Sequence, residues 1–444
     1  MPLFNKGYAF GLKTPVVLDI GEAYTKLGFA DEAEPRAIIP TTIEQVGGPV
    51  CYIFGRNNTA LLGHDIGSDF EKSIKLFLEK IYFKYLQVNP NNQRVILCES
   101  LLNPTKVRET IAKVLFTKFD VPSVLFAPCH LLACFTVATS TALVLDCGHT
   151  ESVVIPVVEG TPLLWAWQSA PLGGATIQDA IMHEIKEKGK IKSENENLLP
   201  VASRLCETVL EDIKVKACLV TEYHRAKQIQ AAKTLELEKE KEATSLTDIQ
   251  RPPDMIYPID GRSRLFIPGP IREEAAEVLF EQDNEKMSLA TLLLDSLCQC
   301  PIDARKALAR NVLVTGGTSL LPGFKHRLLF EMKEIIKEEQ RYEKLSECEF
   351  RVHQPPTKAN LVAWLGASIF ASLDTFEKRS ITKEYFTQHN GRLPDWCVLD
   401  IKSPDKMPER PNTLPTGKKF PTSHVPSRKS TTTAHLDTHS KPSK

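Results

Sequence analysis

Two short segments of the chain share a pattern that could bind phosphate. Residues 17–21 (VLDIG) and 144–148 (VLDCG) each consist of an apolar run, an Asp, one further residue and a Gly. A second strand-like run follows each segment, which predicts two β-hairpins with the Asp and the Gly near the tips. Backbone N–H groups at such a tip can hold phosphate oxygens, and Asp19 and Asp146 together could hold a hydrated Mg²⁺.

A third turn, rich in glycine, lies further along the chain. Gly316, Gly317 and Thr318 follow a strand-like run and precede a helical pattern, so the backbone there could approach a base or a sugar closely. One Asp-x-Gly sequence is common by chance, but two of them together with this turn are more specific, and they predict a clamp for a polyphosphate. The alternative is that Asp19 and Asp146 only cap turns in empty hairpins.

Strands that alternate with helices must position these turns. Strand-like runs occupy residues 15–19, 94–98, 142–146 and 311–314. Segments with helical periodicity lie at residues 69–88, 103–119, 177–188, 207–220, 287–297 and 320–339. This alternation predicts an α/β fold with mixed or parallel sheets.

Composition narrows the class of protein. The 444 residues suggest two or three domains, and 42% of them are hydrophobic, enough for a sizeable core. Lys plus Arg and Asp plus Glu both number 55, which argues against nucleic-acid binding and against electrostatic attachment to membranes. No apolar run reaches the ~18 residues of a membrane span. We expect no secretory signal and therefore 11 reduced cysteines in the cytoplasm.

The balanced charge conceals a basic end. Residues 402–444 hold nine Lys or Arg and three Asp or Glu, and they are rich in Pro, Ser and Thr. This composition predicts a disordered basic tail, and a tail that folds on a partner is the alternative. Residues 186–260 are rich in Lys and Glu and predict an exposed helical insertion.

From about residue 16 to residue 397 the chain resembles the actin superfamily. The resemblance is carried above all by residues 21–32 (GEAYTKLGFADE), 303–324 (DARKALARNVLVTGGTSLLPGF) and 362–376 (VAWLGASIFASLDTF). It implies the actin-like α/β fold that is shared with Hsp70 and sugar kinases, in which two α/β domains flank a nucleotide cleft.

The resemblance also implies domain boundaries. The first actin-like domain would comprise residues 1–137 and 338–401, with a truncated small lobe at about residues 41–68. The second would comprise residues 138–337 and include the insertion at 186–260.

By the same resemblance the cofactor would be ATP or ADP with Mg²⁺, which Asp19 and Asp146 would hold through water. The positions that match the family's nucleotide-binding pattern are Asp19, Gly21, Lys26, Asp146, Gly148, Lys214, Gly316, Gly317 and Thr318.

The chain departs from the family in both phosphate loops. Glu22 and Ala23 stand where actin has Ser and Gly, and His149 and Thr150 stand where actin has Asp and Gly. The Glu22 carboxylate would face the terminal phosphate with like charge, which at ~4 Å under partial burial is unfavourable by several kcal/mol to order of magnitude unless a metal or lysine screens it.

Further departures affect hydrolysis and the base side. Actin's catalytic histidine falls on Val153, and its water-orienting glutamine falls near His130. Its ribose-binding glutamate falls on Val215, and its adenine-stacking lysine falls near Asn360, with Lys358 as an alternative. Hydrolysis needs a water held by hydrogen-bonding side chains, which Val153 cannot supply. The resemblance therefore predicts no catalytic residues, weak or absent ATPase activity, and a structural nucleotide if one binds.

The small lobe is also shortened. Pro40 and Asp69 are separated by 29 positions, and Gly47 to Pro49 interrupt the segment between them. In actin filaments this lobe, at the pointed end of each subunit, docks into the next subunit. A subunit without it would end a head-to-tail polymer; the alternative is that the loop length has no meaning.

The opposite, barbed-end face would be retained. The segment at residues 360–376 predicts one helix, and we expect most of its apolar stripe to face the core. The stripe comprises Leu361, Trp364, Leu365, Ser368, Ile369 and Leu373.

Residues 280–285 (FEQDNE), 381–386 (ITKEYF) and 392–397 (RLPDWC) resemble the branch of the family found at the pointed end of dynactin. This implies a non-catalytic cap in the cytoplasm and cytoskeleton that contacts actin-related filament subunits and the other pointed-end subunits. Through them it would be linked to dynein and cargo adaptors, with no nucleic acid and no membrane insertion. The alternative is an actin-fold ATPase in filament assembly or chromatin remodelling.

Overall fold

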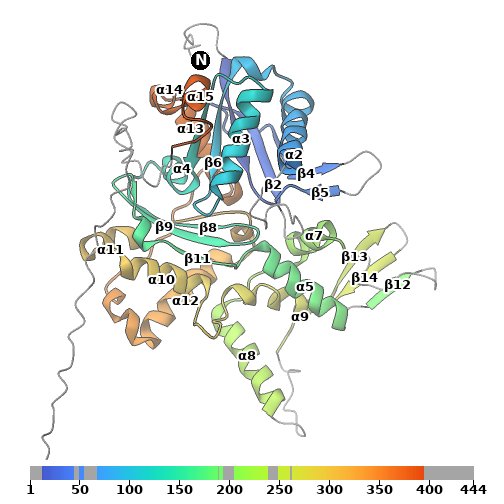
Figure 1. The fold of residues 1–444 in the computed structure, drawn as a ribbon. Helices are drawn as coiled ribbons and strands as arrows, with labels where there is room; N and C mark the ends of the chain where they lie inside the picture. The colour runs from blue at the N-terminus through green and yellow to red at the C-terminus, as the bar shows by residue number, and fades with distance from the viewer. Residues whose placement is uncertain are drawn as a thin grey trace, which may run out of the picture. The chain divides into compact units, whose positions relative to one another are not determined.

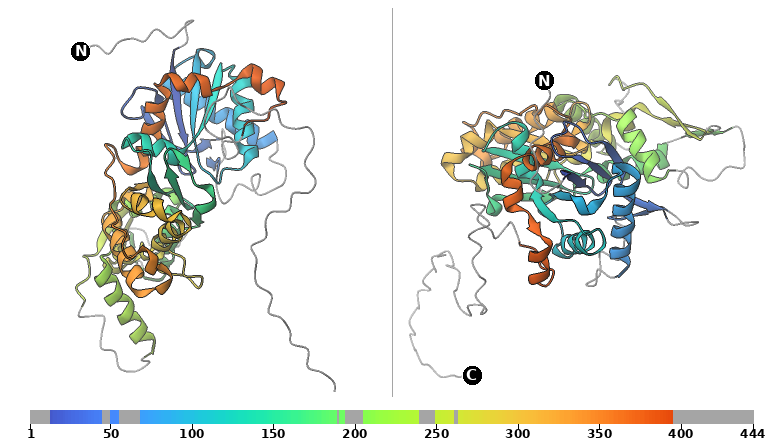
Figure 2. Two further views of the ribbon diagram at one scale, coloured as in Figure 1. Left: turned by 90° about the vertical axis from the view of Figure 1, so that its left-hand side faces the viewer. Right: turned by 90° about the horizontal axis from the view of Figure 1, so that it is seen from above.

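The computed structural model describes residues 13–44, 50–54, 68–188, 190–193, 205–238, 249–260 and 263–394 (Figure 1). The predicted tail at 402–444 lies outside the described residues, as do residues 45–49 and 55–67 of the predicted small lobe. Two main sheets with helices around them make up most of the described chain, as Figure 2 shows from two further directions. The α/β prediction is therefore confirmed.

The first main sheet is mixed and has six strands in the order β16-β7-β6-β1-β2-β3. Its strands are β1 (Lys13–Ile20), β2 (Tyr24–Phe29), β3 (Ala37–Pro40), β6 (Gln93–Glu99), β7 (Ser123–Pro128) and β16 (Ile381–Thr382). The helices around it are α2 (Ser68–Glu79), the π-helix Lys80–Leu86, α3 (Thr105–Lys118), α4 (Cys129–Thr136), α13 (Val362–Ala371), α14 (Asp374–Arg379) and α15 (Lys383–Gln388). A separate hairpin pairs β4 (Thr42–Glu44) with β5 (Val50–Tyr52).

The strand β1 is buried on both faces. Val16 and Leu18 point into the core formed with α2 and α3, while Val17 between them points to the opposite face, where Trp364 of α13 packs. Side chains alternate between the two faces of a strand, so a continuous apolar run is what a strand between two helical layers requires. The indole N–H of Trp364 also donates to the carbonyl oxygen of Val17, at 3.2 Å.

The second main sheet repeats this plan. Its strands run in the order β10-β9-β8-β15, and β11 also pairs with β9. They are β8 (Ala142–Cys147), β9 (Ser152–Val158), β10 (Thr161–Pro162), β11 (Gln168–Ala170) and β15 (Val312–Thr315). The helices around it are α5 (Gly174–Lys188), α10 (Leu289–Gln299), α11 (Ile302–Ala309) and α12 (Phe324–Glu338).

The helices α4 and α13 connect the two sheets. Leu143 and Leu145 of β8 face a core shared with α5, α10 and α12. Val144 faces the other way, toward Cys134 of α4 and Val362 of α13. Because the same two helices also pack on the first sheet, they connect β1 and β8 through a shared apolar layer.

The predicted helical insertion at 186–260 is in fact mixed. It contains the helices α7 (Glu207–Ala217) and α8 (Tyr223–Glu238) and also two strands, β12 (Lys190–Ser193) and β13 (Met255–Asp260). These strands pair on either side of β14 (Ser263–Ile267), which precedes the short helix α9 (Gly269–Glu274). The Lys/Glu-rich composition indicated an exposed surface, but it did not reveal the strands because their partner β14 lies outside the segment.

The single helix predicted at 360–376 is wrong in detail. The structure has a 3₁₀ turn, then α13, then a break at Ser372 before α14. Leu361, Trp364 and Ser368 are buried as expected, but Leu373 is 43% exposed, and Leu365 and Ile369 are half-buried.

The buried side of α13 instead includes Gly366. A Cβ built on it would lie 1.9 Å from the carbonyl oxygen of Leu132 in α4. The close approach of these two helices depends on a missing side chain, so a pattern of large apolar residues could not identify this face.

None of the ten cysteines within the described ranges forms a disulfide. Nor does any helix in this part of the chain combine the length and the apolar character that crossing a membrane would require.

His130 of α4 is buried between the two sheets, with 2% of its surface exposed. Its Nε2 lies 3.3 Å from the carbonyl oxygen of Val153, so Nε2 carries the proton. Its Nδ1 is buried and has no hydrogen-bond partner among the described residues. Burial lowers the pKa of His130 below its ordinary value of 6.5 and outweighs the opposing effect of the Asp146 charge.

This burial predicts a loss of stability in mild acid. Below pH 6.5 the unfolded chain binds a proton at residue 130, whereas the folded chain does not until the lowered pKa is reached. The free energy of unfolding should therefore decrease by about 1.4 kcal/mol for each unit by which the pH is lowered in that interval. Urea unfolding at pH 7.5 and 5.5 should show a smaller fall in His130→Gln, whereas His183→Gln, at an exposed position, should match the wild type. Equal slopes in all three proteins would contradict the assignment.

Candidate functional site

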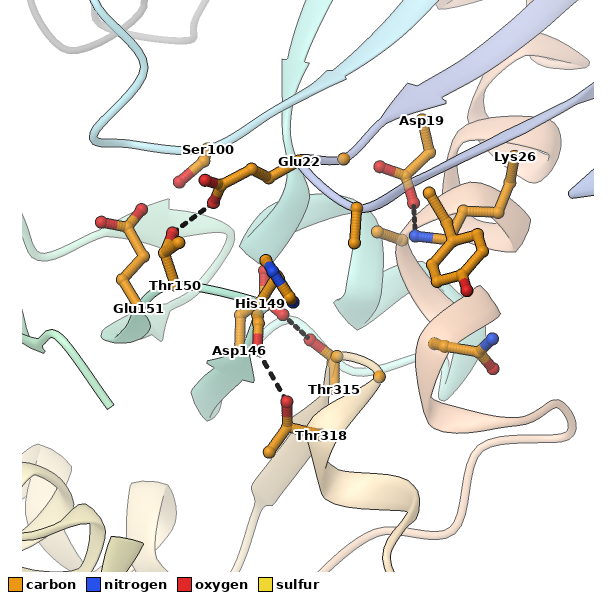
Figure 3. A pocket seen from close by; sticks show the side chains of 18 of the residues that line it. Asp19, Glu22, Lys26, Ser100, Asp146, His149, Thr150, Glu151, Thr315 and Thr318 are labelled. Carbon is orange, nitrogen blue, oxygen red and sulfur yellow. Dashed lines mark hydrogen bonds and ion pairs between the residues drawn. The ribbon is translucent and has the colours of Figure 1, made fainter. Parts of the chain in front are cut away.

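The two predicted hairpins exist and close in the same way. In the first, between β1 and β2, the N–H of Gly21 donates to the carbonyl oxygen of Tyr24 at 3.2 Å. In the second, between β8 and β9, the N–H of Gly148 donates to the carbonyl oxygen of Glu151 at 2.9 Å. Each bond turns the chain within four residues, so the two residues that follow each glycine form a tip. Both tips border one cavity (Figure 3).

This central cavity has a volume of about 930 Å³ and is lined from both main sheets. The nine residues predicted from the sequence all line it: Asp19, Gly21, Lys26, Asp146, Gly148, Lys214, Gly316, Gly317 and Thr318. Segments more than a hundred residues apart are thereby brought together. Their role in binding a nucleotide stays a prediction, but the volume and the mixture of backbone and charged groups suit a ligand of that size.

One end of the cavity carries the residues suited to phosphate and metal. The Lys26 ammonium lies 2.9 Å from the Asp19 carboxylate, and the Thr315 hydroxyl donates to Asp146 at 3.1 Å. Burial lowers the pKa of Lys26, but the charges of Asp19 and Asp146 and the bond to Asp19 raise it more, so the net pKa is raised. The lysine is therefore cationic, and the two carboxylates are hard oxygen ligands of the kind that Mg²⁺ takes.

The other end is built from α7 and from the turn after β15. The ammonium of Lys214 in α7 lies 2.5 Å from Glu211, which also accepts from Gln178 at 2.6 Å. Gly316 has φ +91°, and a Cβ built on it would lie 2.1 Å from the carbonyl oxygen of Cys147. Only glycine fits there, and it lets the turn lie against the second hairpin, where the Thr318 hydroxyl donates to the carbonyl oxygen of Gly148 at 2.7 Å.

The positions matched to actin's hydrolytic residues present no polar side chain to the cavity. Val153 lines it with an apolar side chain. His130 is not among the described residues that line it, and its Nε2 is bonded to the carbonyl of Val153. On the base side, Val215 and Asn360 line the cavity as expected, whereas the alternative, Lys358, is not among the lining residues.

Sequence reasoning missed two contacts between distant segments, of which the first crosses the cavity. The hydroxyl of Thr150, in the second tip, donates to the carboxylate of Glu22, in the first tip. Farther out, the hydroxyl of Tyr52 in β5 bonds to Glu207 at the start of α7, and burial together with this bond raises the pKa of Tyr52 to about 12. Glu22 and Thr150 were noticed as departures from the family, but no local signal indicated that they bond to each other.

Glu151 is a further residue whose place the sequence did not reveal. Its carbonyl closes the second hairpin, while its side chain lines the cavity. Burial raises the pKa of Glu151, and the charges of Glu22 and Asp146 raise it further. Four carboxylates thus line the part of the cavity next to the two hairpins, those of Asp19, Glu22, Asp146 and Glu151.

Comparison with known proteins agrees with this architecture. The sequence matches the model of the family described as Actin over residues 12–393. It is 26% identical to Actin-related protein 10 of Dictyostelium discoideum over 87% of this chain and 90% of that protein. It is 27% identical to Putative actin-29 of the same organism over 85% of this chain and 95% of that protein.

The fold, the paired hairpins and the glycine turn after β15 thus coincide with a family match that covers most of the sequence. The resemblance inferred from the motifs is confirmed, and the chain belongs to the actin family.

Proposed function

We propose that the chain is a non-catalytic actin-related subunit that caps the pointed end of the actin-like filament in dynactin. Similarity to Actin-related protein 10 supports an actin-related role. The observation that carries the proposal is the small size of the lobe between Pro40 and Asp69, whose described part is a hairpin of two three-residue strands. Specific interfaces bury about 800 Å² per partner, and so small a lobe offers little of that surface to a further subunit.

The lobe is also engaged within its own chain, because Tyr52 of β5 bonds to Glu207 at the start of α7. A subunit that can dock on a neighbour through one face, but lacks the matching surface on the opposite face, ends a heterologous polymer.

The proposed partners follow from this position. The chain contacts an actin-related filament subunit on one side and the other pointed-end subunits of dynactin on the other. It acts in the cytoplasm, on the cytoskeleton, and helps link cargo adaptors to dynein. The proposed domain boundaries, 1–137 with 338–401 and 138–337, place the cavity between two actin-like domains.

We further propose that ATP or ADP with Mg²⁺ binds in the central cavity as a structural element. Backbone turns, Lys26 and Lys214 would hold the nucleotide, Asp19 and Asp146 would hold the metal through water, and bound magnesium would neutralise phosphate charge. One ligand would then contact residues from both main sheets and so link the two sheets. Ligand binding to the folded state alone stabilises it.

An ATPase acting in filament assembly or chromatin remodelling is the second candidate. The observation that favours it is Glu151, a cavity-lining carboxylate whose pKa is raised and which could act as a general base toward water. The apolar side chain at Val153 favours the non-catalytic role.

The two candidates differ in turnover. The purified chain should release phosphate from Mg-ATP no faster than a Glu151→Gln, Asp146→Asn double variant. The reason is that the apolar side chain of Val153 cannot orient a water molecule. A phosphate-release assay under multiple-turnover conditions measures this. Phosphate release that depends on Glu151 would instead support the ATPase.

Nucleotide binding is tested by what the protein retains. We expect about one ADP or ATP per chain after denaturation of the purified wild type, and at least about tenfold less in Lys26→Met, because a phosphate near Asp19 and Asp146 would lose its cationic partner. Chromatography of the released nucleotide gives the amount. Lys72→Met, at an exposed position, is the matched control, and equal retention in both variants would contradict the assignment of Lys26.

Capping is tested by position in a filament. The full chain is given an affinity tag, and the actin-related filaments that contain it are isolated and incubated with a label that binds the tag. Electron micrographs should show one label per filament, at one end only. The same isolation without the tag controls for non-specific label. Labels along the filament, or subunits stacked beyond the labelled end, would overturn the proposal.

A further inference from the structure

The small lobe is bonded to the tip of the first hairpin through Thr41, which lies between β3 and β4. The N–H of Thr41 donates to the carbonyl oxygen of Ala23 at 3.0 Å, and its hydroxyl donates to the carbonyl oxygen of Gly21 at 2.7 Å. The carbonyl oxygen of Thr41 accepts from the N–H of Ile53, the residue after β5, at 3.1 Å. Thr41 is fully buried, so water does not compete for these bonds, and we expect β5 to move together with the first tip.

The helix α7 is connected in a similar way to the tip of the second hairpin. The Glu211 carboxylate of α7 accepts from the Gln178 amide of α5 at 2.6 Å, and both helices pack on the core of the second sheet. At the start of α5, the N–H of Ala175 donates to the carbonyl oxygen of His149, in the second tip, at 2.7 Å. We therefore expect α7 to move together with the second tip.

Two side-chain bonds join the first of these groups to the second. One runs from tip to tip, where the hydroxyl of Thr150 donates to the carboxylate of Glu22 (Figure 3). The other runs from the lobe to the helix, where the hydroxyl of Tyr52 in β5 donates to the carboxylate of Glu207 at the start of α7. Lobe, first tip, second tip, α5 and α7 thus form a closed ring of bonded elements.

The bond between the lobe and α7 lies next to the cavity. Phe54, two residues after Tyr52, and Thr208, the residue after Glu207, both line it. In Figure 1, β5 and α7 lie on the right of the two main sheets, whereas α4 and α13 lie on the left. The sheets are therefore connected by apolar packing on one side and by hydrogen bonds on the other.

We propose that Tyr52 is a latch that keeps the central cavity closed, and that its release from Glu207 allows the two hairpin tips to move apart. Separating α4 or α13 from the sheets would expose apolar surface, which is unfavourable. The bond of Tyr52 to an exposed carboxylate can instead be exchanged for bonds to water at a small net change in free energy. Opening therefore occurs on the side of the latch, and the two helices act as the hinge.

This inference goes beyond the proposed function, because it concerns the walls of the cavity and not the kind of ligand. Closure is then a property of the chain itself. A ligand of any chemistry would enter or leave when the latch is released.

Buried cysteines can report this opening without any ligand. Cys98 and Cys129, the cavity pair, line the cavity and are each 9% exposed. Cys147 and Cys300, the core pair, lie in the core of the second sheet and are not among the described residues that line the cavity. Burial raises the pKa of all four thiols, so their alkylation requires an opening of the structure. Opening of the cavity exposes the cavity pair alone, whereas unfolding exposes both pairs.

The test is the rate at which N-ethylmaleimide alkylates each cysteine of the full chain, measured by mass spectrometry of its peptides. We expect Tyr52→Phe to accelerate alkylation of the cavity pair by about threefold to tenfold, which corresponds to the loss of one hydrogen bond. The rates of the core pair should not change, because the variant leaves the packing of the second sheet intact.

Tyr257→Phe is the matched control. The Tyr257 hydroxyl of β13 also donates to a carboxylate of α7, that of Asp212 at 2.7 Å, but β13 belongs to the three-stranded sheet of the insertion and not to the lobe. This variant should leave the rates of the cavity pair as they are in the wild type.

Glu207→Ala provides a second variant, in which the acceptor is removed instead of the donor. It should accelerate alkylation of the cavity pair as Tyr52→Phe does. The double variant should react no faster than either single variant, because both substitutions remove the same bond.

Unchanged rates for the cavity pair in Tyr52→Phe would overturn the inference, as would equal acceleration of both pairs, the same acceleration in Tyr257→Phe, or effects that add in the double variant. The rates are measured without added nucleotide and without filaments. The latch can therefore fail while the tests of nucleotide retention and capping succeed, and it can stand while either of those fails.

Discussion

The negative charge of the carboxylates near the two hairpin tips constrains the whole site. The carboxylates of four residues, Asp19, Glu22, Asp146 and Glu151, line the cavity near the tips, and the Lys26 ammonium is bonded to Asp19. Like charges at short range in a partly buried site repel strongly, so each carboxylate needs a donor or a cation nearby. The structure supplies the Thr315 hydroxyl to Asp146 and the Thr150 hydroxyl to Glu22, and the proposed magnesium would neutralise further charge.

The two tips can be held this close because their strands are rigidly mounted. The strands β1 and β8 each have apolar side chains on both faces, and the helices α4 and α13 contact both sheets. Packing of this kind resists small displacements. The separation of the tips therefore depends on the packing of α4 and α13, including the close approach of Gly366 to the backbone of Leu132.

The chain keeps the framework of the actin family while its cavity carries different chemistry. The glycine turns, Lys26 and Lys214 are retained, and these are the parts that shape the cavity and offer positive charge. The changed positions are apolar, as at Val153, or acidic, as at Glu22. These changes, together with the small lobe, are the basis of the non-catalytic role proposed above.

The sequence alone determined most of the framework. Apolar runs that end in Asp-x-Gly have few alternatives to a strand followed by a tight turn, so β1, β8 and the tips could be predicted locally, as could the glycine turn at Gly316. Nine lining residues of the cavity were found because each sits at such a turn or at a position matched by the family pattern.

Only the tertiary structure decided which side chains meet. The bond between Glu22 and Thr150, the bond between Tyr52 and Glu207, and the place of Glu151 at the cavity join segments that no periodicity relates. The same holds for the break in the helix after Ala371 and for the strand β14. This strand pairs with β12 and β13, which lie in a segment predicted to be helical. Local patterns indicate how a segment prefers to fold. Long-range contacts depend on the distance and angle between the two sheets, which the helices packed between them determine.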